Sequence, residues 1–189
     1  MATGMLNTIP KLVIITHAPL GCGSQIPTVV RSQANNKTLR GLKSTETIWI
    51  NTNLTEFDVV EGGEKKLKEA ILYAEKEFKP DAIAVSVSCV PALIGDDVDS
   101  IVSEAQKLVS AKVFPVHCEG FKSKLVATGY DSTYHGFLKR LVDPDDASEG
   151  DRNLTKQLNQ KKTVNIFVAG SFSYGDTHEL IRLIEAQSL

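Results

Sequence analysis

Short apolar runs alternate along the chain with longer amphipathic stretches, and this alternation predicts its elements. Each expected strand is a brief, largely β-branched run between loop residues, and these runs cover residues 11–16, 47–51, 81–87, 113–116 and 164–169. Each expected helix places apolar residues at helical spacing, over about 25–33, 64–78, 96–109, 132–142 and 176–186. Strands that alternate with helices indicate an α/β fold, a Rossmann-like parallel sheet with helices on both faces.

The same pattern predicts how the chain is divided. Residues 1–142 contain four of the expected strands and form one α/β domain. Residues 143–162 are acidic and then polar, with few large apolar side chains, which is typical of a linker. Residues 163–189 then supply one strand and one helix, the opening of a second α/β domain that is incomplete.

Composition narrows the range of partners. The chain is 42% hydrophobic and 23% charged with a formal charge of −2, so neither a nucleic-acid nor a membrane partner is expected. The apolar runs are too short to span a bilayer, and the first residues lack the basic start and apolar core of a signal peptide. Three widely spaced cysteines are more typical of free thiols in a reducing cytoplasm than of a disulfide framework.

All three cysteines, Cys22, Cys89 and Cys118, follow predicted strands. In open α/β sheets the carboxyl ends of the strands form the edge where ligands bind, so each cysteine is a candidate for chemistry. The alternative is that each is a small, partly buried loop residue. Zinc-finger spacing, the hydrolase Gly-x-Ser-x-Gly turn and the phosphate-binding loop are all missing. The residues alone therefore predict an α/β domain with a cysteine-bearing ligand edge.

Four motifs occur in order along the chain, and together they resemble a known family. They are His17-Ala-Pro-Leu-Gly-Cys22, Val59-Val-Glu-Gly-Gly-Glu-Lys-Lys-Leu67, Cys89-x-x-x-Leu-Ile-Gly-Asp-Asp97 and Cys118-Glu-Gly-Phe121. This arrangement is similar to nitrogenase component 1, the molybdenum-iron protein α/β subunit family, which includes a cofactor-assembly scaffold and nitrogenase-like reductases. The resemblance extends from about residue 12 to 142, and more loosely to 189.

The resemblance implies a chain of three α/β domains, of which this sequence would be the first and the start of the second. It implies that Cys22 and Cys89 are ligands of an iron–sulfur cluster, [4Fe-4S] or larger, bound where two subunits meet. Cys118 is a weaker candidate ligand and is expected to be structural. His17, Gly21 and Gly95 are possible supporting residues at this site. The implied partners are a component 1-like subunit, in a homo- or heterodimer, and an ATP-dependent iron protein that delivers electrons.

The sequence also departs from the family pattern. No cysteine precedes His17, where the family has a further cluster ligand. Near the catalytic cofactor of true nitrogenases, a Gln, a His and an Arg are replaced by Val126, Tyr130 and Val30. A reductase acting on a substrate other than dinitrogen therefore fits the resemblance better.

Three functional hypotheses follow. The first is a component 1-like oxidoreductase subunit or fragment that binds an iron–sulfur cluster at a subunit interface. The second is a non-catalytic isolated domain that serves as a binding or cofactor-assembly module and holds no cluster by itself. It is supported by length, because the family's catalytic pocket needs all three domains and the chain alone is expected to be inactive. The third is a flavodoxin-like flavin or nucleotide binder, which has the strand-end geometry but no phosphate-binding motif.

Overall fold

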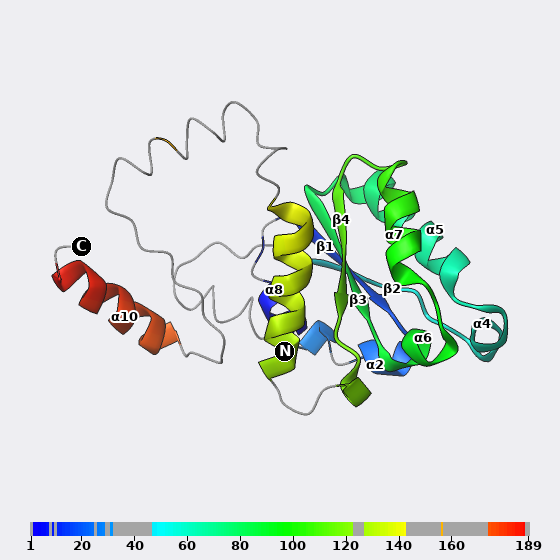
Figure 1. The fold of residues 1–189 in the computed structure, drawn as a ribbon, viewed down its shortest axis with the longest axis horizontal. Helices are drawn as coiled ribbons and strands as arrows, with labels where there is room; N and C mark the ends of the chain where they lie inside the picture. The colour runs from blue at the N-terminus through cyan, green and yellow to red at the C-terminus, as the bar shows by residue number, and fades with distance from the viewer. Residues whose placement is uncertain are drawn as a thin grey trace. The chain divides into compact units, whose positions relative to one another are not determined.

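The computed structural model describes residues 2–7, 9, 11–24, 26–28, 31, 47–122, 127–142, 156 and 174–187 (Figure 1). The chain divides into two compact units, Met1–Leu141 and Val142–Leu189. In the second unit the structure describes helix α10 (Tyr174–Ala186), where the sequence predicts a helix over 176–186. The expected strand 164–169, the linker 143–162 apart from Lys156, and most of the expected helix 25–33 lie outside the described residues.

The first unit is built on a four-stranded parallel sheet, as predicted. Its strands are β1 (Leu12–His17), β2 (Ile48–Asn51), β3 (Ala82–Val87) and β4 (Lys112–His117), in the order β2-β1-β3-β4. Every residue of β1 and β3 is buried, because these two strands are central and both of their faces are covered.

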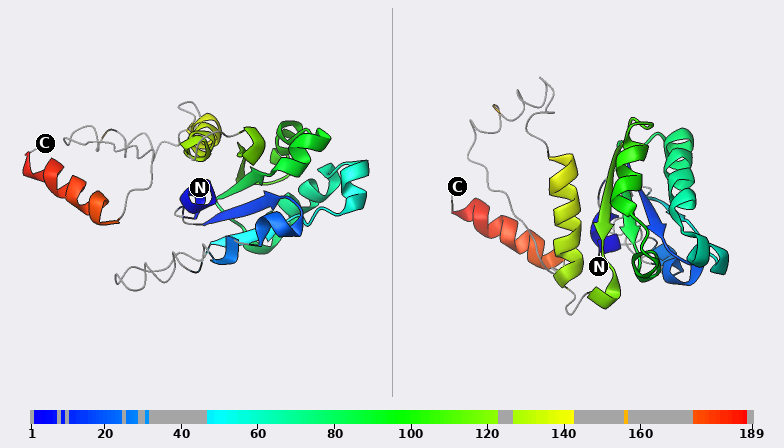
Figure 2. Two further views of the ribbon diagram at one scale, coloured as in Figure 1. Left: turned by 90° about the horizontal axis from the view of Figure 1, so that it is seen from below. Right: turned by 45° about the vertical axis from the view of Figure 1, so that its right-hand side comes forward.

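Helices cover both faces of this sheet (Figures 1 and 2). One face packs against α5 (Glu64–Phe78) and α7 (Val98–Gln106), and Val13 and Ile15 of β1 point into that core. The other face packs against α1 (Ala2–Leu6) and α8 (Ala127–Leu141), and Leu12 and Ile14 point to that side. Alternate side chains of a strand point to opposite faces, so one apolar run fills both cores.

The strand order creates a topological switch point between β1 and β3. From β1 the chain goes to β2 on one side, and it then returns to place β3 on the other side. Connections that leave two adjacent strands in opposite directions leave a crevice at the carboxyl ends of those strands, which is where α/β sheets bind ligands.

Several short helices lie where the sequence analysis placed loops. The stretch 52–63 contains α4 (Glu56–Glu61), and the segments after β1 and β3 form α2 (Leu20–Gly23) and α6 (Cys89–Ile94). A short 3-10 helix, η1 (Gly120–Lys122), follows β4. The longer helices also differ in length: α7 is confined to Val98–Gln106, and α8 begins at Ala127 rather than at Ser132. Four to six residues are too few to show a helical period, so the sequence pattern could not separate these turns from loops.

Candidate functional site

The three cysteines follow three adjacent strands of the sheet. Cys22 lies in α2 after β1, Cys89 is the first residue of α6 after β3, and Cys118 directly follows β4. All three therefore belong to the carboxyl edge of the sheet, and α2 and α6 lie at the same end of it (Figure 1). Cys22 and Cys89 follow the two strands that flank the switch point.

The cysteines differ in their surroundings. Cys22 is exposed, while Cys89 and Cys118 are partly buried. The Cys118 Sγ lies 3.3 Å from the Ser86 Oγ and 3.5 Å from the Val87 carbonyl oxygen. Burial raises the pKa of the Cys118 thiol above its ordinary value, so this group stays protonated at neutral pH. Because metals bind the thiolate, Cys118 is the least suited of the three to be a ligand.

The Cys89 sulfur already has one protein partner. The backbone N–H of Gly120 donates to the Cys89 Sγ over 3.2 Å. This contact links the loop after β3 to the loop after β4, and thus joins the third and fourth of the sequence motifs. It orients Cys89 without occupying the remaining sides of its sulfur.

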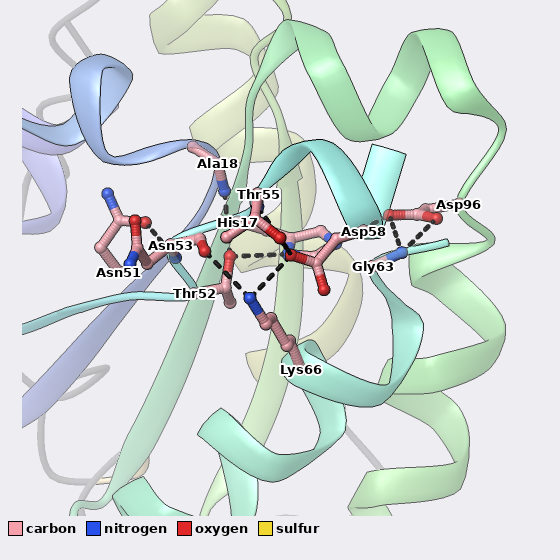
Figure 3. Close-up of polar contacts among 10 residues, drawn as sticks. All are labelled: His17, Ala18, Asn51, Thr52, Asn53, Thr55, Asp58, Gly63, Lys66 and Asp96. Atoms are coloured by element: carbon pink, nitrogen blue, oxygen red, sulfur yellow. Dashed lines mark hydrogen bonds and ion pairs between the residues drawn. The ribbon is translucent and has the colours of Figure 1, made fainter. Parts of the chain in front are cut away.

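His17, the last residue of β1, lies at the centre of a buried polar network (Figure 3). Its Nδ1 is 3.0 Å from the Thr52 Oγ1, and its Nε2 is 3.0 Å from the Asp96 Oδ2. The Asp96 carboxylate also accepts the Gly63 N–H over 3.0 Å. His17, Gly63 and Asp96 come from three different motifs of the sequence, and the fold brings them together.

Burial favours the neutral form of the His17 imidazole. Burial lowers the pKa of His17 below its ordinary value, against the opposing effect of Asp96. The Ala18 N–H donates to the Thr52 Oγ1, and because a carboxylate can only accept, a neutral His17 donates from Nε2 to Asp96 and accepts the Thr52 hydroxyl hydrogen at Nδ1. A neutral imidazole with its proton on Nε2 then donates to Asp96, and every group in the network has a partner.

Two glycines of the motifs have a physical reason to be glycine. A Cβ on Gly63 would lie 2.7 Å from the Asp96 Oδ2, 2.8 Å from the Leu54 Cδ2 and 2.9 Å from the His17 Cε1, so the buried network leaves no room for a side chain. Gly95 has a φ of 88° and ends α6 in the left-handed conformation that favours glycine. A Cβ on Gly21 would meet no atom within 4 Å.

The two aspartates after Gly95 have separate roles. The Asp97 Oδ1 accepts the Ser100 N–H over 3.0 Å and caps α7, as expected of a residue at a helix start. Asp96 is instead turned toward His17 and Gly63, although its position just before α7 is also typical of a helix-capping residue. A partner 79 residues away in sequence is not visible to local pattern analysis.

Sequence reasoning missed one further polar cluster. Asp58 accepts hydrogen bonds from the Thr55 N–H and from Lys66, which hold the pKa of the Asp58 carboxyl well below its usual range (Figure 3). Thr55 and Asp58 form a capping box that starts α4. The Thr-x-x-Asp spacing in the sequence is the signal that could have revealed this helix.

Among the residues that the structure describes, no group of three or more His, Cys, Asp or Glu side chains could hold a metal ion. The carboxyl edge therefore presents individual thiols rather than a complete metal site. Clusters of the [4Fe-4S] type are held by four cysteine thiolates. The sequence of this chain contains three cysteines, which is fewer than that number.

Comparison with known proteins identifies the family. All of residues 1–189 match the family described as nitrogenase component 1 type oxidoreductase. The chain belongs to this family.

Its relatives include nitrogenase alpha chains and cofactor biosynthesis proteins. The chain is 33% identical over 171 residues to the nitrogenase molybdenum-iron protein alpha chain of Methanosarcina barkeri, covering 90% of this chain and 30% of that protein. It is 36% identical over 186 residues to the nitrogenase iron-molybdenum cofactor biosynthesis protein NifE of Methanococcus maripaludis, covering 96% of this chain and 34% of that protein. The chain thus spans about a third of the length of these relatives.

Solved structures agree with the family. The structure of nitrogenase Cp1 at pH 6.5 superimposes with a TM-score of 0.61 at 27% identity, covering 75% of this chain and 28% of that chain. The same protein at pH 5 gives a TM-score of 0.59 at 30% identity. The parallel sheet with helices on both faces is therefore the nitrogenase component 1 fold that the resemblance implied.

The structure describes only some of the residues on which the remaining sequence-based expectations depend. Of the three positions that depart from the nitrogenase pattern, Tyr130 lies in α8, while Val30 and Val126 lie outside the described residues. In the part of the chain that the structure describes, no helix has the length and apolar character needed to cross a membrane.

Proposed function

We propose that this chain is the cluster-binding part of a nitrogenase component 1-like oxidoreductase subunit and holds an iron–sulfur cluster through Cys22 and Cys89. The observation that carries the proposal is the position of these cysteines after β1 and β3, on either side of the switch point. That crevice is the usual ligand site of an open α/β sheet. Family membership supports the same assignment.

The two cysteine sulfurs are suitable ligands for an iron–sulfur cluster. Cys22 is exposed and Cys89 is only partly buried, so both sulfurs lie near the surface of the carboxyl edge. Two thiolates from each of two chains supply the four that a [4Fe-4S] cluster needs. When bound, the cluster accepts and releases single electrons. The chain's own residues orient the thiolates, as the Gly120 N–H does for the Cys89 Sγ.

The proposed partners come from membership of the family. A second component 1-like chain completes the site, as an identical or a related subunit. An ATP-dependent iron protein supplies the electrons, and a reducing cytoplasm keeps the three thiols free.

The test is iron and acid-labile sulfide content after anaerobic reconstitution. We expect about two irons per chain, which corresponds to one four-iron cluster per dimer. Cys22→Ala and Cys89→Ala are each expected to lose the iron and the visible absorbance of the cluster. Cys118→Ala is the matched control, since its buried thiol is expected to contribute no ligand, and it should keep the full iron content.

Iron content that is unchanged in Cys22→Ala and Cys89→Ala would contradict this ligand assignment. A folded, iron-free parent protein would contradict cluster binding altogether. A yellow protein without iron would instead support the flavin-binding hypothesis.

A second candidate function is cofactor assembly. It is favoured by the 36% identity to the NifE protein, which extends over 96% of this chain. The two functions differ in the fate of the metal. An assembly protein gives up its iron to a cofactor-free molybdenum-iron protein, whereas an electron-transfer subunit keeps its iron through repeated cycles of reduction. Iron in each partner, measured after mixing and separating them, distinguishes the two.

A further inference from the structure

The cluster function leaves one contact of Cys89 unexplained, the hydrogen bond from Gly120. The Gly120 N–H donates to the Cys89 Sγ, and no backbone carbonyl accepts from it among the described contacts. Gly120 comes from the loop after β4, and Cys89 begins the helix after β3. The turn that contains Gly120 does not need this hydrogen bond, because the Cys89 sulfur belongs to a segment that follows a different strand.

The neighbouring Glu119 holds this turn in place. Glu119 is almost fully buried, and its Oε1 lies 3.1 Å from the Lys122 Nζ and 3.5 Å from the His117 Nδ1. The Lys122 N–H also donates to the Glu119 carbonyl oxygen over 3.1 Å, which closes η1. His117 is anchored in turn by Asp99, 2.8 Å from its Nε2. The orientation of the Gly120 amide is thus set from both sides of the turn.

Glu119 remains charged in this position. Burial alone would raise the pKa of its carboxyl, but the hydrogen bond from its own backbone N–H, together with Lys122 and His117, brings the pKa below its ordinary value. A charged, buried carboxylate keeps its partners more firmly than a neutral one does.

We propose that the Gly120 amide sets the reduction potential of the cluster bound by Cys89, and that Glu119 is the positioning residue that aims this amide. The proposal rests on the cluster function proposed above. Reduction adds negative charge to the cluster and its thiolates. A hydrogen bond donated to a thiolate sulfur stabilises the reduced form more than the oxidised form and raises the potential.

The glycine allows a matched pair of variants. Gly120→Pro removes the N–H, and a proline is compatible with the first residue of a helical turn. Gly120→Ala keeps the N–H, and its Cβ would meet only the Cys89 Sγ at 3.6 Å, an ordinary van der Waals distance. The proline also places its ring Cδ where the amide hydrogen points at the Cys89 Sγ, so a variant that adds no atom beside the sulfur is needed as well, and Glu119→Gln is that variant.

The experiment is a redox titration of the reconstituted full chain, followed by electron paramagnetic resonance, with iron content measured in parallel. We expect the midpoint potential of Gly120→Pro to shift to a more negative value and that of Gly120→Ala to stay at the parent value. Glu119→Gln keeps the size of the side chain and loses its charge, so it should give a smaller shift in the same direction with full iron content. This variant also decides the question if Gly120→Pro does not fold.

The outcomes separate the two proposals. A parent protein without iron contradicts the cluster function and this inference together. Full iron with unchanged potentials in Gly120→Pro and Glu119→Gln contradicts this inference alone. A potential that shifts equally in Gly120→Ala would show that added bulk, and not the lost donor, moves the potential.

Discussion

His17 makes the stability of the first unit sensitive to pH. Its side chain is fully buried and its pKa is lowered, so the folded protein binds this proton at a lower pH than the unfolded chain does. The unfolded state therefore holds more protons once the pH falls below the ordinary histidine pKa of about 6.5. Stability is fully present above that value and is lost as the pH falls toward the folded pKa.

The expected result is an unfolding free energy that falls by at most about 1.4 kcal/mol per pH unit from this one group below about pH 6.5. Denaturant unfolding at a series of pH values between about 7.5 and about 5 measures this change in the unfolding free energy. His17→Gln should be less stable but lack this slope, while His135→Gln, at an exposed position of α8, should keep it. A slope that survives in His17→Gln would assign the effect to other groups.

For single residues, the sequence identifies the candidates for the site but not the contacts that they make. The motifs contain His17, Gly63 and Asp96, and strand-end reasoning places Cys22, Cys89 and Cys118 at one edge. The pairing of His17 with Asp96 depends on strands β1 and β3 becoming neighbours, which no local pattern contains. In the same way, the contact of Gly120 with Cys89 depends on strands β3 and β4 becoming neighbours.

The hydrogen bonds of His17 and Asp96 connect three segments of the fold. Asp96 lies in the segment between α6 and α7, Gly63 precedes α5, and His17 ends β1. The start of α5 is therefore fixed against the segments that carry Cys22 and Cys89.

Gly63→Ala tests this junction. Its Cβ would lie within 2.9 Å of three packed groups, which is expected to cost about 1–3 kcal/mol of stability by overpacking. Gly21→Ala is the matched control, because its Cβ would meet no atom within 4 Å and alanine favours the helical conformation. Thermal unfolding of both variants measures the difference, and an equal melting temperature for the two would contradict the packing described for Gly63.

Elements with a strong period were predictable and short ones were not. The helix over residues 64–78 matches α5 residue for residue, because its apolar face repeats over four turns. α4 was missed because Phe57 and Val60 of its six residues point outward, so its apolar side chains do not mark a buried face. Its start depends on the capping of Thr55 by Asp58 instead.

The first unit as a whole presents an apolar carboxyl edge. Exposed large side chains occur on α2, α4, α6 and η1, all of which follow the carboxyl ends of strands: Leu20, Phe57, Val60, Leu93 and Phe121. Exposed apolar side chains grouped at one edge favour contact with another protein surface. This is the edge that carries Cys22 and Cys89, so a second chain bound there would bury the apolar side chains and add the missing thiolates.

Native mass spectrometry of the anaerobically reconstituted protein tests whether two chains share one cluster. We predict a dimer whose mass exceeds that of two chains by about four irons and four sulfides, and monomers that carry no iron. Cys22→Ala should abolish this species. Monomers that carry a complete cluster, or dimers without iron under conditions that load the cluster into other proteins, would show that two chains do not share a cluster.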